Sequence, residues 1–303
     1  MFMTILISVF IAGVLQAVMQ SFNGVLQGYV GLFGTSLMTH LVGGVLLILY
    51  IILIQKEKIR LWPMPIHLYS AGFFGLALVA ASSLCVAQIG AALTTCLNIS
   101  GQLVFSILID HFGWMGVKQV RFKPKRLLCL LTILAGLLIV NLGGRSSLTS
   151  PSGKYAVAYI LLAFFMGGIN VYSKTVNFQA TKYLGTSNGT LVNYVVASFL
   201  SILLLFTFEH SYAHINTFIA APTWLYLGGV CGVIALVINV ISLRKINLFQ
   251  STILLLVGQL TGSTVLDAIL FQDMSLLKLI GVIIVAIGII WDKKKTATLP
   301  SSH

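Results

Sequence analysis

The sequence predicts an all-α membrane protein in which ten transmembrane helices form two inverted repeats of five helices each. Three observations lead to this fold class: an apolar composition, ten apolar runs of membrane-spanning length, and polar motifs that recur in both halves of the chain. Of the 303 residues, 58% are hydrophobic and 8% are charged, whereas a soluble domain carries about 25% charged residues. The composition therefore predicts an integral membrane protein that contacts the lipid bilayer.

Each apolar run is close to the ~20 residues that a helix needs to cross the hydrocarbon layer. The runs span approximately residues 3–28, 35–54, 67–89, 92–113, 127–143, 155–180, 187–208, 223–243, 248–271 and 276–291. No basic residue precedes the first run, and no clear small-residue cleavage site follows it. We therefore expect the first run to be a retained helix and not a removed signal peptide.

A polar motif in the fourth run recurs in the ninth run at a constant offset of 157 residues. The segments Gly101–Asp110 and Gly258–Asp267 are identical at five of ten positions. In each copy a Gln, a Ser and an Asp follow one another at steps of four residues, which places them on one side of a helix. Polar side chains in an apolar helix are costly unless they face protein or water. The motif therefore predicts two related halves around a polar centre.

A second polar face recurs between the first and sixth runs at an offset of 154 residues. Its members follow the spacing of one helix face. They are Gln16, Gln20, Asn23 and Gln27 in the first run, and Asn170, Lys174, Asn177 and Thr181 in the sixth. Further pairs keep this offset: Gly13 with Gly167, Tyr29 with Tyr183, Gly31 with Gly185, and Thr39 with Asn193.

The duplication divides the chain into residues 1–146 and 147–303, with the Gly- and Ser-rich stretch Asn141–Lys154 as the linker. Each repeat holds five helices. Because five is odd, the second repeat is expected to enter the membrane from the opposite face. Arg126 and Lys278 lie at the start of the fifth helix of each repeat, so the inversion would place them at opposite surfaces.

The formal net charge of +12 follows the expected membrane topology. If the chain starts in the cytoplasm, 15 of the 18 basic residues face the cytoplasm, and Arg145, Lys154 and Lys278 face outward. This asymmetry is the positive-inside pattern, and it predicts that both termini lie on the cytoplasmic side of a bacterial-type inner membrane. The charge therefore needs no nucleic-acid partner to explain it.

The candidate substrate-binding residues are the polar side chains of the recurring faces. They are Gln16, Gln20, Asn98, Gln102, Asn170, Lys174, Asn193 and Gln259. For each of them the alternative is a hydrogen bond between helices, which Asn and Gln often make in lipid. Lys174 replaces Gln20 of the first half and adds a positive charge. It either binds an anionic part of the substrate or reaches the cytoplasmic interface by snorkelling.

The candidate gating residues are the two aspartates that end the recurring motif. Asp110 is expected near the inner surface and Asp267 near the outer one, with Arg126 and Lys278 as candidate basic partners. Each aspartate would form an ion pair or helix-end hydrogen bonds that break as its side opens. The alternative is a carboxylate that only reaches water at a helix end.

No metal or cofactor is expected. Glu209, His210 and His214 share one outer loop, but solvated loop residues explain this cluster better than a metal site does. The four cysteines, Cys85, Cys96, Cys129 and Cys231, fall within apolar runs without the spacing of metal ligands.

The chain resembles the drug/metabolite transporter superfamily, and within it the YdcZ-like family. The resemblance rests on Gly101-Gln102 and on Ile109-Asp110-His111-Phe112-Gly113, followed by a basic segment and the fifth helix. The second half has Ala268-Ile269-Leu270 in place of the His-Phe-Gly ending. The resemblance implies a ten-helix bundle of the EamA/EmrE type, a central cavity, alternating access and a small metabolite or drug as substrate.

One departure from the related small multidrug exporters concerns ion coupling. Those exporters carry an embedded Glu in the first helix, whereas this first helix has Gln16 and Gln20 and no acid. Proton-for-cation antiport through a central carboxylate is therefore not expected.

We expect a secondary transporter, acting as an exporter, because no phosphate-binding loop, activated nucleophile or metal cluster suggests an enzyme. Two alternatives stay open. A membrane-embedded lipid-processing enzyme would need acids or histidines clustered at one membrane face, and a non-transporting membrane subunit would need soluble regulatory segments. The expected partners are a small-molecule substrate and a coupling ion, and the protein is expected to be a monomer or a homodimer.

Overall fold

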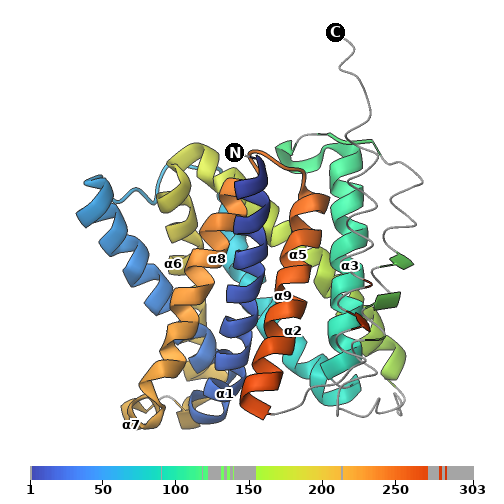
Figure 1. The fold of residues 1–303 in the computed structure, drawn as a ribbon. Coiled ribbons are helices and arrows are strands. Elements are labelled where there is room, and N and C mark those ends of the chain that lie inside the picture. The colour runs from blue at the N-terminus through green and yellow to red at the C-terminus, as the bar shows by residue number, and fades with distance from the viewer. Residues whose placement is uncertain are drawn as a thin grey trace.

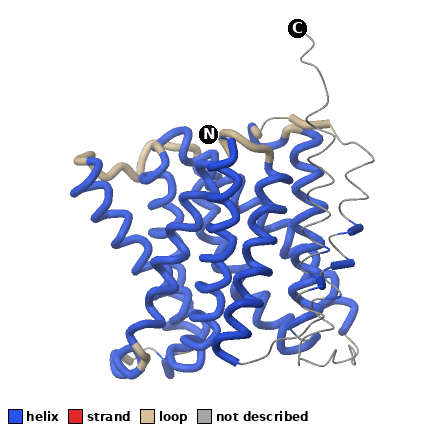
Figure 2. Tube along the Cα trace, in the orientation of Figure 1, coloured by secondary structure: helices blue, strands red, loops and turns tan. Residues whose placement is uncertain are grey.

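The structure is a computed structural model in which the regular elements of the described residues are all helical (Figures 1 and 2). It describes residues 2–271, except 90, 118, 122–130, 133–134, 137–138, 140–154 and 213, and also residues 280, 281 and 284. The expected fifth run (127–143) and tenth run (276–291) lie mostly outside the described residues.

The first long helix consists of two segments separated by a sharp break at Gly31. Helix α1 (Phe2–Leu49) continues into the π-helical turn η1 (Tyr50–Gln55), and the apolar stretch Met3–Gln55 has 53 residues. A straight helix of that length would measure about 80 Å, far more than the ~30 Å hydrocarbon layer. Gly31 has φ 75° and ψ −179°, which a glycine adopts without steric cost. Figure 1 shows the chain reversing direction there.

The remaining long helices follow the expected runs closely. They are α2 (Ser70–Ile89), α3 (Ala91–Phe112), α5 (Ala156–Leu184), α6 (Thr186–Phe208), α8 (Leu227–Ser242) and α9 (Leu248–Phe271). Short elements connect them: η2 (Ile66–Tyr69), η3 (Trp114–Gly116), η4 (His210–Tyr212), α7 (Ile215–Ala220) and η5 (Thr223–Tyr226). Among the described residues, five helical stretches are long and apolar enough to cross a membrane, and Met3–Gln55 is the first of them.

Corresponding helices of the two halves run in opposite directions. In Figure 1 the first segment of α1 descends from the N label, whereas α5 ascends. Likewise α3 ascends and α9 descends. The helix of the first run is therefore antiparallel to that of the sixth, and the helix of the fourth run is antiparallel to that of the ninth.

The turns of the two halves have matching backbone geometry. Gly185, between α5 and α6, has φ 81° and ψ 169°, close to the values of Gly31. Pro65 and Pro222 both precede a 3-10 turn with φ −54°. Tyr69 donates its hydroxyl to the carbonyl of Leu61, and Tyr226 donates to that of Phe218. Each of these pairs keeps the offset of 154 or 157 residues found in the sequence.

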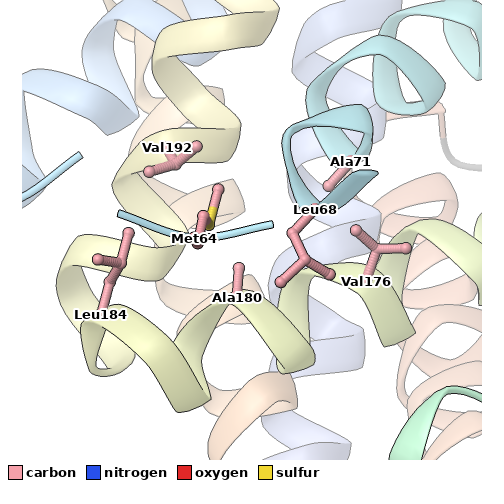
Figure 3. Close-up of a cluster of buried hydrophobic side chains, with 7 residues drawn as sticks. All are labelled: Met64, Leu68, Ala71, Val176, Ala180, Leu184 and Val192. Carbon is pink, nitrogen blue, oxygen red and sulfur yellow. The ribbon is translucent and has the colours of Figure 1, made fainter. Parts of the chain in front are cut away.

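Two apolar clusters repeat the same packing at the two ends of the bundle. The first cluster fixes the start of α2 against the turn between α5 and α6, and Figure 3 shows its side chains converging from these elements. It consists of Met64, Leu68, Ala71, Val176, Ala180, Leu184 and Val192. The second cluster contains Leu26, Val30, Ala221 and Leu225, with Phe22 and Met38 packed against it. Its members are the counterparts of the first at the same two offsets.

Two close helix crossings occur at pairs of glycines. A Cβ on Gly13 of α1 would lie 2.8 Å from the Cα of Gly258 in α9, and one on Gly101 of α3 would lie 3.2 Å from the Cα of Gly167 in α5. By contrast, a Cβ on Gly75 would meet nothing within 4 Å. The absence of a side chain therefore lets each polar motif helix contact the backbone of its neighbour.

Candidate functional site

Three of the predicted polar residues form a hydrogen-bonded chain between α3 and α5. Lys174 Nζ donates to Gln102 Oε1 at 3.1 Å, and Gln102 Nε2 donates to Asn98 Oδ1 at 2.7 Å. Lys174 is 9% exposed and Gln102 is 5% exposed. Gln102 directly follows Gly101, so the glycine crossing brings its amide within reach of α5. The structure thus joins residues that lie 72 positions apart in the sequence.

The depth of Lys174 in the bundle follows from its position in α5. It lies ten residues, or about 15 Å, before the end of the helix at Leu184. Gln102 also lies ten residues before the end of α3, at Phe112. Both helices end at the same face of the bundle (Figure 1), and the hydrocarbon layer is about 30 Å thick. The ammonium therefore contacts Gln102 inside the helix bundle, two to three turns before the end of α5.

The charge of Lys174 has a single neutral partner within the described part of the chain. Gln102 Oε1 is the acceptor of its ammonium, and no described carboxylate oxygen lies within 4.0 Å of it. A buried charge normally needs an opposite charge as well as hydrogen bonds. Lys174 has only one neutral hydrogen bond.

Several other buried amides of the polar faces make no hydrogen bond to described residues. These are Gln16 Oε1, both polar atoms of Asn177, and Asn193 Oδ1. In the first half, the counterparts of Asn177 and Asn193 do bond, because Thr39 donates to Asn23 Oδ1 at 3.0 Å. Each unsatisfied buried polar group costs roughly 1–3 kcal/mol. Hydrogen bonds between helices therefore do not account for the buried amides of Asn177 and Asn193 in the second half.

The remaining predicted binding residues lie apart from this hydrogen-bonded chain. Asn170 is half-buried one turn before Lys174 on α5, and Gln259 is half-buried beside the crossing of α9 with α1. Gln20, the counterpart of Lys174, is exposed. The structure therefore brings Asn98, Gln102 and Lys174 together.

Asp110 binds the N-terminus of α9. Its Oδ1 accepts the backbone N–H of Leu248 at 3.1 Å, and its Oδ2 accepts that of Phe249 at 2.9 Å. The side chain is fully buried, so the alternative of a carboxylate in water is wrong. The first N–H groups of a helix lack partners within the helix and carry a partial positive charge. Asp110 therefore links the end of α3 in the first half to the start of α9 in the second.

The other predicted gating groups fall outside the described part of the chain. Arg126, Lys278 and the side chain of Asp267 are not described, although the backbone of Asp267 lies near the end of α9.

Glu209 makes an equivalent contact, which was not predicted. Its Oε1 accepts the backbone N–H of Leu32 at 3.0 Å, and its Oε2 accepts that of Phe33 at 2.8 Å. These amides start the second segment of α1 directly after Gly31. The expectation of a solvated loop residue is therefore wrong for Glu209. In the sequence, the feature that could have indicated this contact is an acid directly after the seventh apolar run.

The two carboxylate contacts lie at opposite faces of the bundle. Helix α9 begins at the face that carries the N label, and α1 reverses direction at the other face (Figure 1). Basic segments gather at the first face, around the start of α6. The backbone N–H of Arg60 donates to Asn188 Oδ1 at 2.9 Å, and the Arg244 guanidinium donates to Thr186 Oγ1 at 2.9 Å.

Comparisons with known proteins agree with this architecture. A family model described as "Putative inner membrane exporter, YdcZ" matches residues 4–139 and 158–291. One solved crystal structure has a TM-score of 0.72 to this chain at 16% identity, over 98% of this chain and 99% of the other. This likeness concerns the fold alone, because unrelated functions share folds. No curated protein matches the sequence.

Proposed function

Because the chain belongs to the YdcZ family of inner-membrane exporters in the drug/metabolite transporter superfamily, we propose that it is a secondary transporter that exports a small solute by alternating access. The observation that carries this proposal is the repetition of turns, clusters and crossings between halves whose helices run in opposite directions. Such inverted halves offer two related conformations, one open to each side. With the fifth and tenth runs added, the proposed bundle has ten helices in two inverted repeats.

The polar faces of α1, α3, α5 and α9 form the proposed substrate pathway. Lys174, Gln102 and Asn98 are its hydrogen-bonded residues between α3 and α5. Gln16, Gln20, Asn170, Asn193 and Gln259 are the further proposed lining residues. The amides without partners support this role, because a polar solute would supply the missing hydrogen bonds.

The carboxylate contacts at the two faces are the proposed gates. Each joins a helix of one half to the N-terminus of a helix of the other half, so rocking of the halves would strain one contact at a time. Asp267 is proposed to act on the start of α3, as Asp110 acts on α9, with Arg126 and Lys278 as nearby basic groups. The basic residues around the start of α6 favour a cytoplasmic location for that face and for both termini.

The lipid-processing alternative has less support. Such an enzyme would present free acids at one membrane face, whereas Asp110 and Glu209 bind helix N-termini at opposite faces. The deciding experiment is flux of a labelled metabolite panel in proteoliposomes of the full chain, with and without proton or sodium gradients. Gradient-driven flux that exceeds that of empty liposomes is the expected result. Turnover of labelled lipid without flux would contradict the proposal.

A further inference from the structure

The buried ammonium of Lys174 has fewer partners than its charge requires. A lysine carries three N–H donors, and within the described residues one of them is used, by Gln102 Oε1 at 3.1 Å. A charged group near the centre of a membrane costs about 2.5–3.5 kcal/mol on insertion scales. A single neutral amide does not offset that cost, and no described negative group contacts the ammonium.

The chain places no described acid beside Lys174. Its six acidic residues lie at the ends of apolar runs or in loops. Of those with described side chains, Asp110 and Glu209 accept backbone N–H groups, and Glu57 is exposed. No described residue supplies a negative charge to the ammonium, and a bound molecule could supply it.

The neighbours of Lys174 are arranged to keep its charge available. Gln102 gives its Nε2 to Asn98, which turns its Oε1 toward the ammonium. This orientation requires a donor at Lys174 and leaves the carboxamide of Asn98 half-buried beside the pair. Asn170, also half-buried, follows the same face of α5 one turn away. Lys174 therefore keeps two N–H donors beyond the one that Gln102 accepts, and a carboxylate is a suitable acceptor for them.

The positive charge is also confined to one half of the protein. Gln20, the counterpart of Lys174, is neutral and exposed, although similar glycine crossings lie near Gln20 and near Lys174. Packing does not require a lysine here, since the same crossing forms beside a glutamine in the first half. The asymmetry therefore indicates a role in recognition.

We infer that Lys174 binds the carboxylate of a small organic acid and that the protein selects such anions over their neutral and cationic analogues. This inference rests on the proposed function. Gln102 and Asn98 act as positioning residues that orient the site.

The test compares ligands of similar size that carry a negative charge, no charge or a positive charge. Benzoate, benzamide and benzylamine, together with a panel of aliphatic acids, amides and amines, are titrated into the purified full chain, and the shift in Tm gives each affinity. For the wild type, acids are expected to bind roughly tenfold or more tightly than the matching amides, since a charge-assisted contact is lost in the amide. Equal binding of acid and amide, or no stabilisation by any acid, would overturn the inference without any variant.

Variants then assign the preference to Lys174. Lys174→Gln is expected to lose the preference for acids and Lys174→Arg to keep it, while Lys182→Gln serves as the matched control. Lys182 lies on the same helix but is exposed and donates to the carbonyl of Gly116. A preference for acids that persists in Lys174→Gln would contradict the assignment.

Flux measurements separate this inference from the proposed function. Transport of amides or amines by both wild type and Lys174→Gln would support the transporter and refute the anion site. Binding of acids that depends on Lys174 but occurs without flux of any solute would support the anion site and refute the transporter.

Discussion

Replacement of Asp110 by Asn tests the proposed gate most sharply. The carboxylate accepts two backbone N–H groups, from Leu248 at 3.1 Å and from Phe249 at 2.9 Å. An asparagine offers one acceptor oxygen and no charge, so one charge-assisted hydrogen bond is lost. Such bonds contribute about 1.5–3 kcal/mol, which corresponds to roughly a ten- to hundredfold change in an opening equilibrium.

Hydrogen–deuterium exchange of the purified protein measures this opening directly. In Asp110→Asn, exchange at Leu248 and Phe249 is expected to accelerate by that factor, because the start of α9 opens more often. Exchange at Leu32 and Phe33, which Glu209 binds at the other face, should not accelerate. Glu57→Gln, at an exposed loop acid, is the control. Unchanged exchange at the start of α9, or equal acceleration at both faces, would refute the reasoning.

Three further predictions concern other contacts. Glu209→Gln is expected to accelerate exchange at the start of the second segment of α1 and to leave the start of α9 unchanged, and the reverse pattern would contradict the assignment of the two faces. Gly101→Ala places a methyl group against the backbone of Phe164, and overpacking of about 1–3 kcal/mol should lower the Tm in size-exclusion melts, whereas Gly75→Ala should leave it unchanged. Equal Tm values for Gly101→Ala and Gly75→Ala would contradict the close approach of α3 and α5 at Gly101. Asn177→Leu removes two buried polar atoms that have no described partner, so the Tm should stay or rise while flux falls, and a lower Tm would mean that the amide is needed for folding.

The repeat read from the sequence also relates structural features that were not used to find it. The offsets of 154 and 157 residues, read from a few polar and glycine identities, also relate the turns at Gly31 and Gly185 and the apolar clusters. This agreement arises because a duplicated sequence must bury duplicated apolar faces. The sequence placed Lys174 and Gln102 on two polar faces, but it did not predict that the two side chains meet.

The contacts of the carboxylates could not be read from the sequence. The partners of Asp110 and Glu209 are backbone N–H groups, which every residue except proline carries, so no side-chain pattern marks them. The crossing of Gly13 with Gly258 was also missed as a packing contact. Its glycines were visible, but the choice of neighbouring helices depends on the tertiary arrangement.

Cysteine accessibility at one pair of repeat-related positions tests the inverted arrangement most directly. Tyr29 and Tyr183 lie 154 residues apart, just before Gly31 and Gly185, and are 40% and 58% exposed. Each is changed to Cys in a background without native cysteines, and a membrane-impermeant maleimide is applied to sealed vesicles of known orientation. The account predicts labelling of Tyr183→Cys from the cytoplasmic side and of Tyr29→Cys from the outer side. Labelling of both from the same side would contradict it.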